Sequence, residues 1–258
     1  MKKAILILTT TLLFAASCTN KQQEDQDILQ NQKIMDYLSN AYGFASEDIE
    51  ETNDAFVAEG DILFPKEGFW ETFGPREEVV ASDRKHYHNT YLVTTTDYIK
   101  INIKPGVPAT WITAIEDAVE EWNDLYGGLY FEVSYSNSHN NIYGAVNVSM
   151  NGTLPSTVFA RGASPSNQGN PGSTLLINPK YNHLALSPKT LVIAHEIGHT
   201  IGFMHTDKGQ GSLITEVSSS CRNNPDLNSV MRSGQKSNDL FLGFTSCDIE
   251  AYDALYYW

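Results

Sequence analysis

Residues 195–205 read HEIGHTIGFMH and hold three of the seven histidines of this 258-residue chain. His195 and His199 are four residues apart, so on an α-helix they share one face and lie about 6 Å from each other. Two imidazoles at that spacing can each turn a nitrogen toward one zinc ion, at about 2.0–2.1 Å. Glu196 is adjacent and can reach a water molecule held by such an ion. The spacing therefore predicts a helix that carries part of a metal site.

The third histidine, His205, needs a turn in the chain to reach the same ion. On a continuous helix it would stand about 9 Å beyond His199 and face another direction. Gly202 is the residue at which the chain can turn, because glycine adopts left-handed backbone angles at no steric cost. Three histidine ligands then leave one coordination position open for water, which is typical of catalytic rather than structural zinc.

The pattern of apolar residues after residue 90 predicts a strand, a helix, several strands, a helix, an irregular segment and a last helix. The site helix begins near Ser187 and Pro188, and a last helix is capped around Thr245. The order of these elements favours an α+β fold. The predicted strands cover 98–104, 129–133, 145–148, 157–160 and 174–177, and an amphipathic helix covers 111–122.

The string HEIGHTIGFMH resembles the HExxHxxGxxH signature of the metzincin clan of metalloproteases, and in particular the bacterial HEIGH metallopeptidase family. The resemblance covers about residues 95–258. It implies a twisted mixed sheet of about five strands with an active-site helix and a C-terminal helix. It further implies one catalytic Zn²⁺ held by His195, His199 and His205, with Glu196 as general base. By the same resemblance Met231, in the string SVMRS, lies beneath the metal, and an edge strand near 157–162 pairs with an extended substrate.

The N-terminus has the pattern of an export signal. Lys2 and Lys3 precede a short apolar run, residues 4–16, which at about 1.5 Å per residue cannot cross a hydrocarbon core of roughly 30 Å. Residues 14–18, FAASC, resemble a bacterial lipobox, in which Cys18 becomes the lipidated first residue of the mature protein. A plain secretory cut is the alternative. We expect an exported bacterial lipoprotein of the outer membrane or cell surface, held by a lipid anchor only.

Acidic residues gather in the first third of the mature chain. The formal net charge is −14, and residues 18–90 carry 6 basic and 16 acidic residues. Such a charge excludes nucleic acid as a main partner, since phosphate binding needs a basic face. Residues 19–32 are polar and predict a solvated tether. We divide the chain into a signal peptide (1–17), a tether and pro-like region (18–90) and a catalytic domain (91–258).

The sequence EGDI, residues 59–62, lies in the pro-like region and resembles the FxGD element of astacin propeptides. In that element the aspartate occupies the zinc site, so the resemblance implies that Asp61 is a latency ligand, released by cleavage near Arg84 and Lys85. This chain has Ala58 where the element has phenylalanine. A simple surface turn remains the alternative.

Two cysteines, Cys221 and Cys247, remain after the lipidation site. In an exported protein two such cysteines usually form a disulfide, and two metal thiolates are the alternative. The loops 136–141 and 164–173 could hold calcium but lack dense carboxylates, so the calcium requirement stays open. The remaining histidines are expected at the surface or in loops: His86, His88, His139 and His183.

Together these features predict a monomeric, lipid-anchored zinc metalloendopeptidase acting on protein or peptide substrates. Two alternatives stay open at this point. One is an exported binding or adhesion lipoprotein built on a degenerate protease fold. The other is a zinc hydrolase of non-peptide amides.

Overall fold

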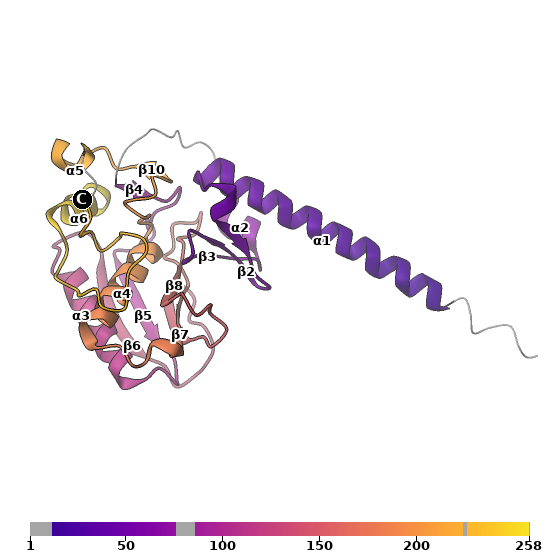
Figure 1. Cartoon of the computed structure of the whole chain (residues 1–258), viewed down its shortest axis with the longest axis horizontal. Helices are drawn as coiled ribbons and strands as arrows, with labels where there is room; N and C mark the ends of the chain where they lie inside the picture. The colour runs from indigo at the N-terminus through magenta and orange to yellow at the C-terminus, as the bar shows by residue number, and fades with distance from the viewer. Residues whose placement is uncertain (1–11, 76–85, 224–225, 258) are drawn as a thin grey trace, which may run out of the picture.

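The computed structural model describes residues 12–75, 86–223 and 226–257, and the side chains of residues 12–24 lie outside the description. Helix α1 (Leu12–Tyr42) projects from the rest of the chain in Figure 1, and its C-terminal part packs into a hydrophobic core. Residues 19–32, expected as an irregular tether, are helical, although residues 25–30 are exposed. Their glutamine, leucine and lysine residues have good helix propensity. Among the described helices, none is long and apolar enough to cross a membrane.

An eight-stranded mixed sheet forms the centre of the molecule (Figure 1). The α+β class is confirmed, but the sheet has eight strands rather than about five. The difference arises because three N-terminal strands extend the five that follow residue 90. In spatial order the strands are β1 (Ile49–Glu51), β2 (Ala55–Ala58), β3 (Ile62–Pro65), β8 (Ala160–Ala163), β9 (Thr174–Ile177), β7 (Val146–Met150), β5 (Tyr98–Ile103) and β6 (Tyr130–Tyr135).

Strand direction changes at β8. β5 runs parallel to β6 and β7, and β7 runs parallel to β9, whereas β8 is antiparallel to β9. On its other side β8 pairs in parallel with β3, and β1, β2 and β3 form an antiparallel meander. β8 begins three residues later than the strand predicted at 157–160, because the Val158 N–H bonds to the Pro155 carbonyl in a turn.

Helices α3 (Ala109–Asn123) and α4 (Leu186–Ile201) pack on each other and on the sheet. The predicted stripe of α3 is buried, and its Trp122 lies at the centre of the main core. Trp122 donates a hydrogen bond from Nε1 to the carbonyl of Ala194 in α4. Its ring contacts four other aromatic rings: Phe131, Phe203, Phe244 and Tyr252. The last of these belongs to the C-terminal helix α6 (Ser246–Tyr256), which starts at Thr245 with a capping box, as predicted.

The N-terminal strands have a core of their own. It is rich in aromatic side chains and joins the end of α1 to β2, β3 and the short helix α2 (Phe69–Phe73). Its largest members are Tyr42, Phe44, Phe56, Phe64, Phe69 and Phe73. Because Tyr87 and Met204 also belong to this cluster, the N-terminal core abuts the segment that carries His205.

Short elements complete the chain. β4 (Tyr87–His88) pairs with β10 (Ser212–Leu213) in a second, two-stranded sheet. The others are the 3₁₀ helices η1 (Ser46–Asp48) and η2 (Pro179–Tyr181) and the helix α5 (Ser219–Asn223).

Candidate metal centre

The predicted helix and turn place the three histidines of the motif together. His195 and His199 lie on one face of α4, which ends at Gly202 with φ +110°. A Cβ at Gly202 would come within 2.8 Å of Leu92 and 3.0 Å of the Tyr91 carbonyl. Glycine is therefore required here both by the backbone angle and by the close packing. After this turn the chain runs back and brings His205 beside the helix.

The three imidazoles point their Nε2 atoms at one location. His195 Nε2 lies 3.0 Å from His199 Nε2 and 3.2 Å from His205 Nε2. Three nitrogens on one tetrahedral zinc would be about 3.3 Å apart, given bonds of about 2.0–2.1 Å. All three rings are buried. The spacing of the donors fits a zinc ion.

Each ring is held through its other nitrogen. His195 Nδ1 lies 2.7 Å from the Val230 carbonyl, and His199 Nδ1 lies 2.8 Å from the Phe203 carbonyl. Both partners only accept hydrogen bonds, so each Nδ1 carries the proton and each Nε2 keeps its lone pair. Burial, and then His195, holds the pKa of His199 well below its usual range, which keeps that ring neutral as a metal ligand must be.

His205 is oriented by a carboxylate from the N-terminal region. Its Nδ1 lies 2.6 Å from Glu59 Oε2, and the Glu59 side chain is fully buried. Burial disfavours a charged His205 ring, but Asp61 and Glu59 outweigh it and raise its pKa to about 10. Asp61 and Glu59 thus favour a positive charge at the His205 ring.

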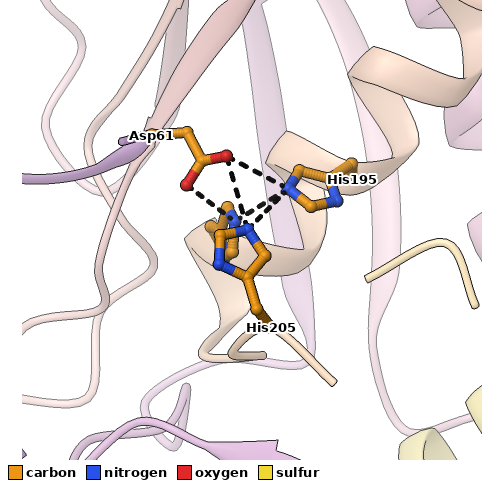
Figure 2. Close-up of side chains that lie close together, drawn as sticks. Asp61, His195 and His205 are labelled. Carbon is orange, nitrogen blue, oxygen red and sulfur yellow. Dashed lines mark hydrogen bonds and ion pairs between the residues drawn. The ribbon is translucent and has the colours of Figure 1, made fainter. Parts of the chain in front are cut away.

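Asp61 occupies the remaining side of the histidine cluster, as Figure 2 shows. Its Oδ2 lies 3.3 Å from His205 Nε2 and 3.6 Å from His195 Nε2, and its Oδ1 lies 3.7 Å from His199 Nε2. Burial acts to raise the pKa of Asp61, but the histidines, His205 foremost, hold it well below its usual range. Three imidazole nitrogens and one carboxylate oxygen form a complete tetrahedral donor set for zinc.

The backbone around Asp61 places it there. Glu59 and Gly60 link β2 to β3 in a tight turn with φ of +54° and +101°. The Arg161 side chain of β8 donates a hydrogen bond from Nε to the Gly60 carbonyl, and the Gly162 N–H donates to the Asp61 carbonyl. The turn is therefore fastened to the same strand that borders the histidines.

Glu196 lines the cavity beside the cluster together with Asp61 and His195. Its Oε2 is buried and has no hydrogen-bond partner among the described residues. Burial, and then the nearby Asp61, raises the pKa of Glu196 well above its usual range. A carboxyl group in this state is suited to carry a proton.

Met231 packs against the site helix α4 at Gly198. A Cβ on Gly198 would lie 2.3 Å from the Met231 sulfur. The glycine of the motif therefore leaves the space that the methionine side chain occupies. Asp248 holds this turn from below: it accepts hydrogen bonds from Ser229 Oγ at 2.6 Å and from the Val230 N–H at 3.1 Å. Val230 in turn provides the carbonyl that orients His195.

Two supporting carboxylates escaped the sequence reasoning. Glu59 stands two residues before Asp61, and Asp248 is the third residue after the helix cap Thr245. Glu59 belongs to the EGDI string, and Asp248 lies in the first turn of the predicted C-terminal helix. The partner of each carboxylate is far away in sequence. Glu59 reaches across 146 positions to His205, so no local pattern could predict that contact.

The cysteine pairing is confirmed, while other predicted positions are not described. Cys221 and Cys247 form a disulfide that joins α5 to α6. The side chain of Cys18, most of the predicted signal peptide and the expected cleavage point at Arg84 and Lys85 lie outside the described residues.

Comparison with known proteins places the chain in a family. Two solved structures of myroilysin resemble it. The first superposes with a TM-score of 0.43 at 9% sequence identity, and the match covers 64% of this chain and 82% of the myroilysin chain. The second has TM-score 0.41 and 11% identity, covering 64% and 86%. No curated protein matches significantly. Residues 72–256 match the model of the dual-action HEIGH metallo-peptidases, and the chain therefore belongs to this family of zinc metallopeptidases.

Proposed function

We propose that the chain is an exported, lipid-anchored zinc endopeptidase whose residues 18–90 hold its catalytic domain, residues 91–258, in a latent state. The observation that carries this proposal is the position of Asp61 against His195, His199 and His205, at 3.3–3.7 Å. The carboxylate stands where an open catalytic site would admit water. A chain with this arrangement should bind zinc but should not hydrolyse peptide substrates.

Glu196 is the proposed general base. Zinc, when bound to the three histidines, supplies the Lewis acidity that polarises a substrate carbonyl and acidifies water. Glu196 accepts the proton of the attacking water at a carboxylate oxygen and later delivers it to the leaving amine. Its buried, unpartnered Oε2 is available for this transfer. With Asp61 gone, one cause of the raised Glu196 pKa disappears, so the carboxylate becomes a better proton acceptor in the active form.

The N-terminal region also blocks the strand that a substrate needs. β8 borders the cavity, and an extended peptide would bind by adding a strand to its edge. β3 already pairs there, with Ile62 opposite Gly162 and Leu63 opposite Ala163. The Ser164 N–H also donates to the Leu63 carbonyl. Latency thus has two parts, a carboxylate at the metal site and a strand on the substrate edge.

Membrane attachment rests on the sequence alone. Lys2, Lys3 and the FAASC string ending at Cys18 support lipidation, and α1 would then lead from the anchor to the folded region. A Cys18→Ser variant should leave the membrane fraction and lose labelling by a radioactive fatty acid. A variant that keeps both would refute the anchor without affecting the peptidase proposal.

The latency proposal is tested on the uncleaved mature chain by casein hydrolysis and zinc content. Asp61→Ala should raise hydrolysis at least about tenfold, corresponding to about 1.4 kcal/mol of lost inhibition, while zinc stays near one per catalytic site. Adding Glu196→Gln to that variant should abolish the gain. Asp54→Ala is the matched control, because Asp54 is exposed in the same region. Unchanged hydrolysis in Asp61→Ala would refute the role of Asp61 as the latency ligand.

A further inference from the structure

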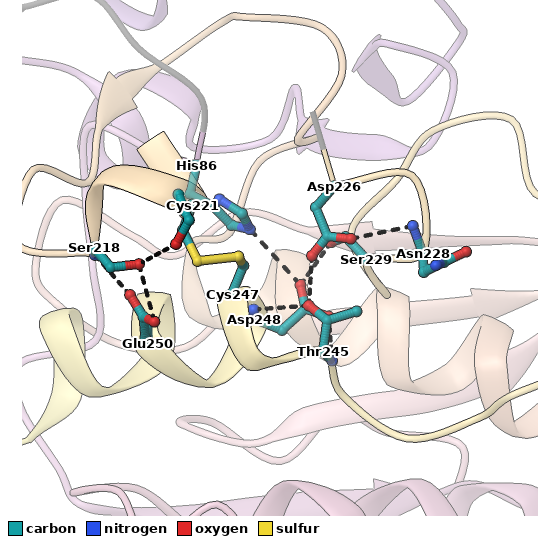
Figure 3. The surroundings of a disulfide bond; sticks show 11 residues. His86, Ser218, Cys221, Asp226, Asn228, Ser229, Thr245, Cys247, Asp248 and Glu250 are labelled. Carbon is teal, nitrogen blue, oxygen red and sulfur yellow. Dashed lines mark hydrogen bonds and ion pairs between the residues drawn. A yellow bond between two sulfur atoms is a disulfide. The ribbon is translucent and has the colours of Figure 1, made fainter. Parts of the chain in front are cut away.

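A second cluster of ligand-type residues lies away from the catalytic histidines, beside the disulfide. It consists of His86, Asp226 and Asp248, each of which offers one ligand atom within 4.8 Å of the other two (Figure 3). The three residues come from distant parts of the chain: the start of the segment before β4, the loop before the methionine turn, and the first turn of α6. The fold has therefore gathered them.

His86 was expected at the surface or in a loop; it lies in a bend before β4, but its side chain is buried. Only 1% of its surface is exposed, and neither ring nitrogen has a hydrogen-bond partner within 3.5 Å among the described residues, although the Cys221 backbone is near enough to favour the charged ring. Leaving a buried imidazole without partners costs free energy, since its nitrogens lose water and gain nothing in return. In Figure 3 the ring points toward Asp248, with His86 Nε2 3.9 Å from Asp248 Oδ1. That distance is too long for a hydrogen bond but leaves room for an ion between the two atoms.

The two carboxylates face the ring with lone pairs to spare. Asp248 is buried, and its Oδ1 accepts one hydrogen bond, from Ser229 Oγ. Asp226 accepts one from Thr245 Oγ1 at 2.5 Å and one from the Asn228 N–H at 3.1 Å. In the described part of the chain, no lysine or arginine forms an ion pair with either carboxylate. Among the residues that the structure describes, no basic side chain balances their negative charge.

The protonation states agree with metal binding. Burial lowers the pKa of His86, with Asp248 and Asp226 acting against it, so the ring is neutral near pH 7 and keeps a lone pair. Burial also raises the pKa of Asp248, and Asp226 adds to that increase. A divalent cation between them would relieve the repulsion of the carboxylates and provide a partner for one nitrogen of the His86 ring.

We propose that His86, Asp226 and Asp248 bind a second divalent cation of the first transition row, zinc being the ion to test. One imidazole nitrogen with two carboxylate oxygens suits such ions, whereas calcium prefers oxygen ligands throughout. The site is structural: Asp248 holds Ser229 and Val230 in the methionine turn, so an ion on Asp248 would fix that turn from behind. The site is independent of the latency proposed above.

The test counts zinc bound per chain after equilibration with Zn²⁺ and removal of free metal, using the full mature chain. We expect two zinc ions in the wild type and one in His86→Gln. A variant with His195, His199 and His205 all changed to alanine should keep one, and adding His86→Gln to it should leave none. His183→Gln is the matched control, because His183 is exposed and should not alter the count.

A second variant tests the same site in case His86→Gln does not fold. Asp226→Asn preserves shape and should likewise reduce the count from two to one, with an unchanged circular dichroism spectrum. Thermal unfolding of the triple-alanine variant should shift upward when zinc is added, and that shift should vanish with His86→Gln. One zinc in the wild type, or two in both His86→Gln and Asp226→Asn, would overturn the proposal. Either result leaves the catalytic centre untouched, so the two sites are judged separately.

Discussion

The contact between Glu59 and His205 leads to a prediction about metal affinity. Glu59 Oε2 lies 2.6 Å from His205 Nδ1, and both side chains are fully buried. A carboxylate that orients a ligating histidine typically contributes 10–100-fold to metal affinity. Glu59→Gln keeps an oxygen that can accept the Nδ1 proton but removes the charge. We expect zinc to bind the uncleaved chain about tenfold more weakly, a loss of about 1.4 kcal/mol. Glu59→Ala also removes the acceptor and should cost about a hundredfold.

The assay is competition for zinc against a chelator of known affinity at pH 7. Glu51→Gln is the control, because this glutamate is exposed in β1 and pairs with Lys66. It should bind zinc as the wild type does. The reasoning would be refuted if Glu59→Gln and Glu59→Ala both matched the wild type, since His205 would then need no partner from the N-terminal region.

Three further predictions concern catalysis and stability. Glu196→Gln should retain zinc and lower casein hydrolysis by about 10²–10⁴-fold in the activated enzyme, as steady-state rates and metal analysis will show. Gly162→Ala should destabilise the chain by about 1–3 kcal/mol in denaturant unfolding, because its Cβ would lie 2.7 Å from the Glu196 carbonyl. Gly152→Ala should have no such effect, because its Cβ would make only an ordinary contact with Pro179 at 3.9 Å. Replacing both cysteines of the disulfide by serine should lower the free energy of unfolding by about 3.5 kcal/mol, from the loop closed by a separation of 26 residues. An unaltered unfolding midpoint would contradict either stability prediction.

Most of the region after residue 90 was predictable because its signals are local. The buried stripe of α3, the glycine turn at Gly202 and the cap at Thr245 each depend on residues within a few positions. The eight-stranded sheet was not predictable in the same way. β3 joins β8 by pairing Ile62 with Gly162, a hundred positions away. The local sequence of neither strand indicates which strand it pairs with.

In the candidate site, too, the parts that depend on local sequence were predictable and the parts that depend on distant residues were not. The spacing of His195, His199 and His205 follows from helix geometry and one turn, so sequence alone suggests a shared metal. Asp61 came from a resemblance, with a surface turn left as the alternative, and the structure places it at the histidines. His86 lies outside any helix or strand, as expected, but its burial was not predictable, because its acidic neighbours lie 140 and 162 positions further along the chain.

The separate aromatic core of the N-terminal strands has a consequence for activation. A cut near Arg84 and Lys85 would break the covalent connection but would leave the pairing of β3 with β8 in place. The severed piece then becomes a bound inhibitor that leaves only by dissociation. Before the cut its effective concentration is in the millimolar range, and afterwards dilution governs its release. Onset of activity should therefore lag behind cleavage, and dilution of the cleaved enzyme should raise the fraction that becomes active.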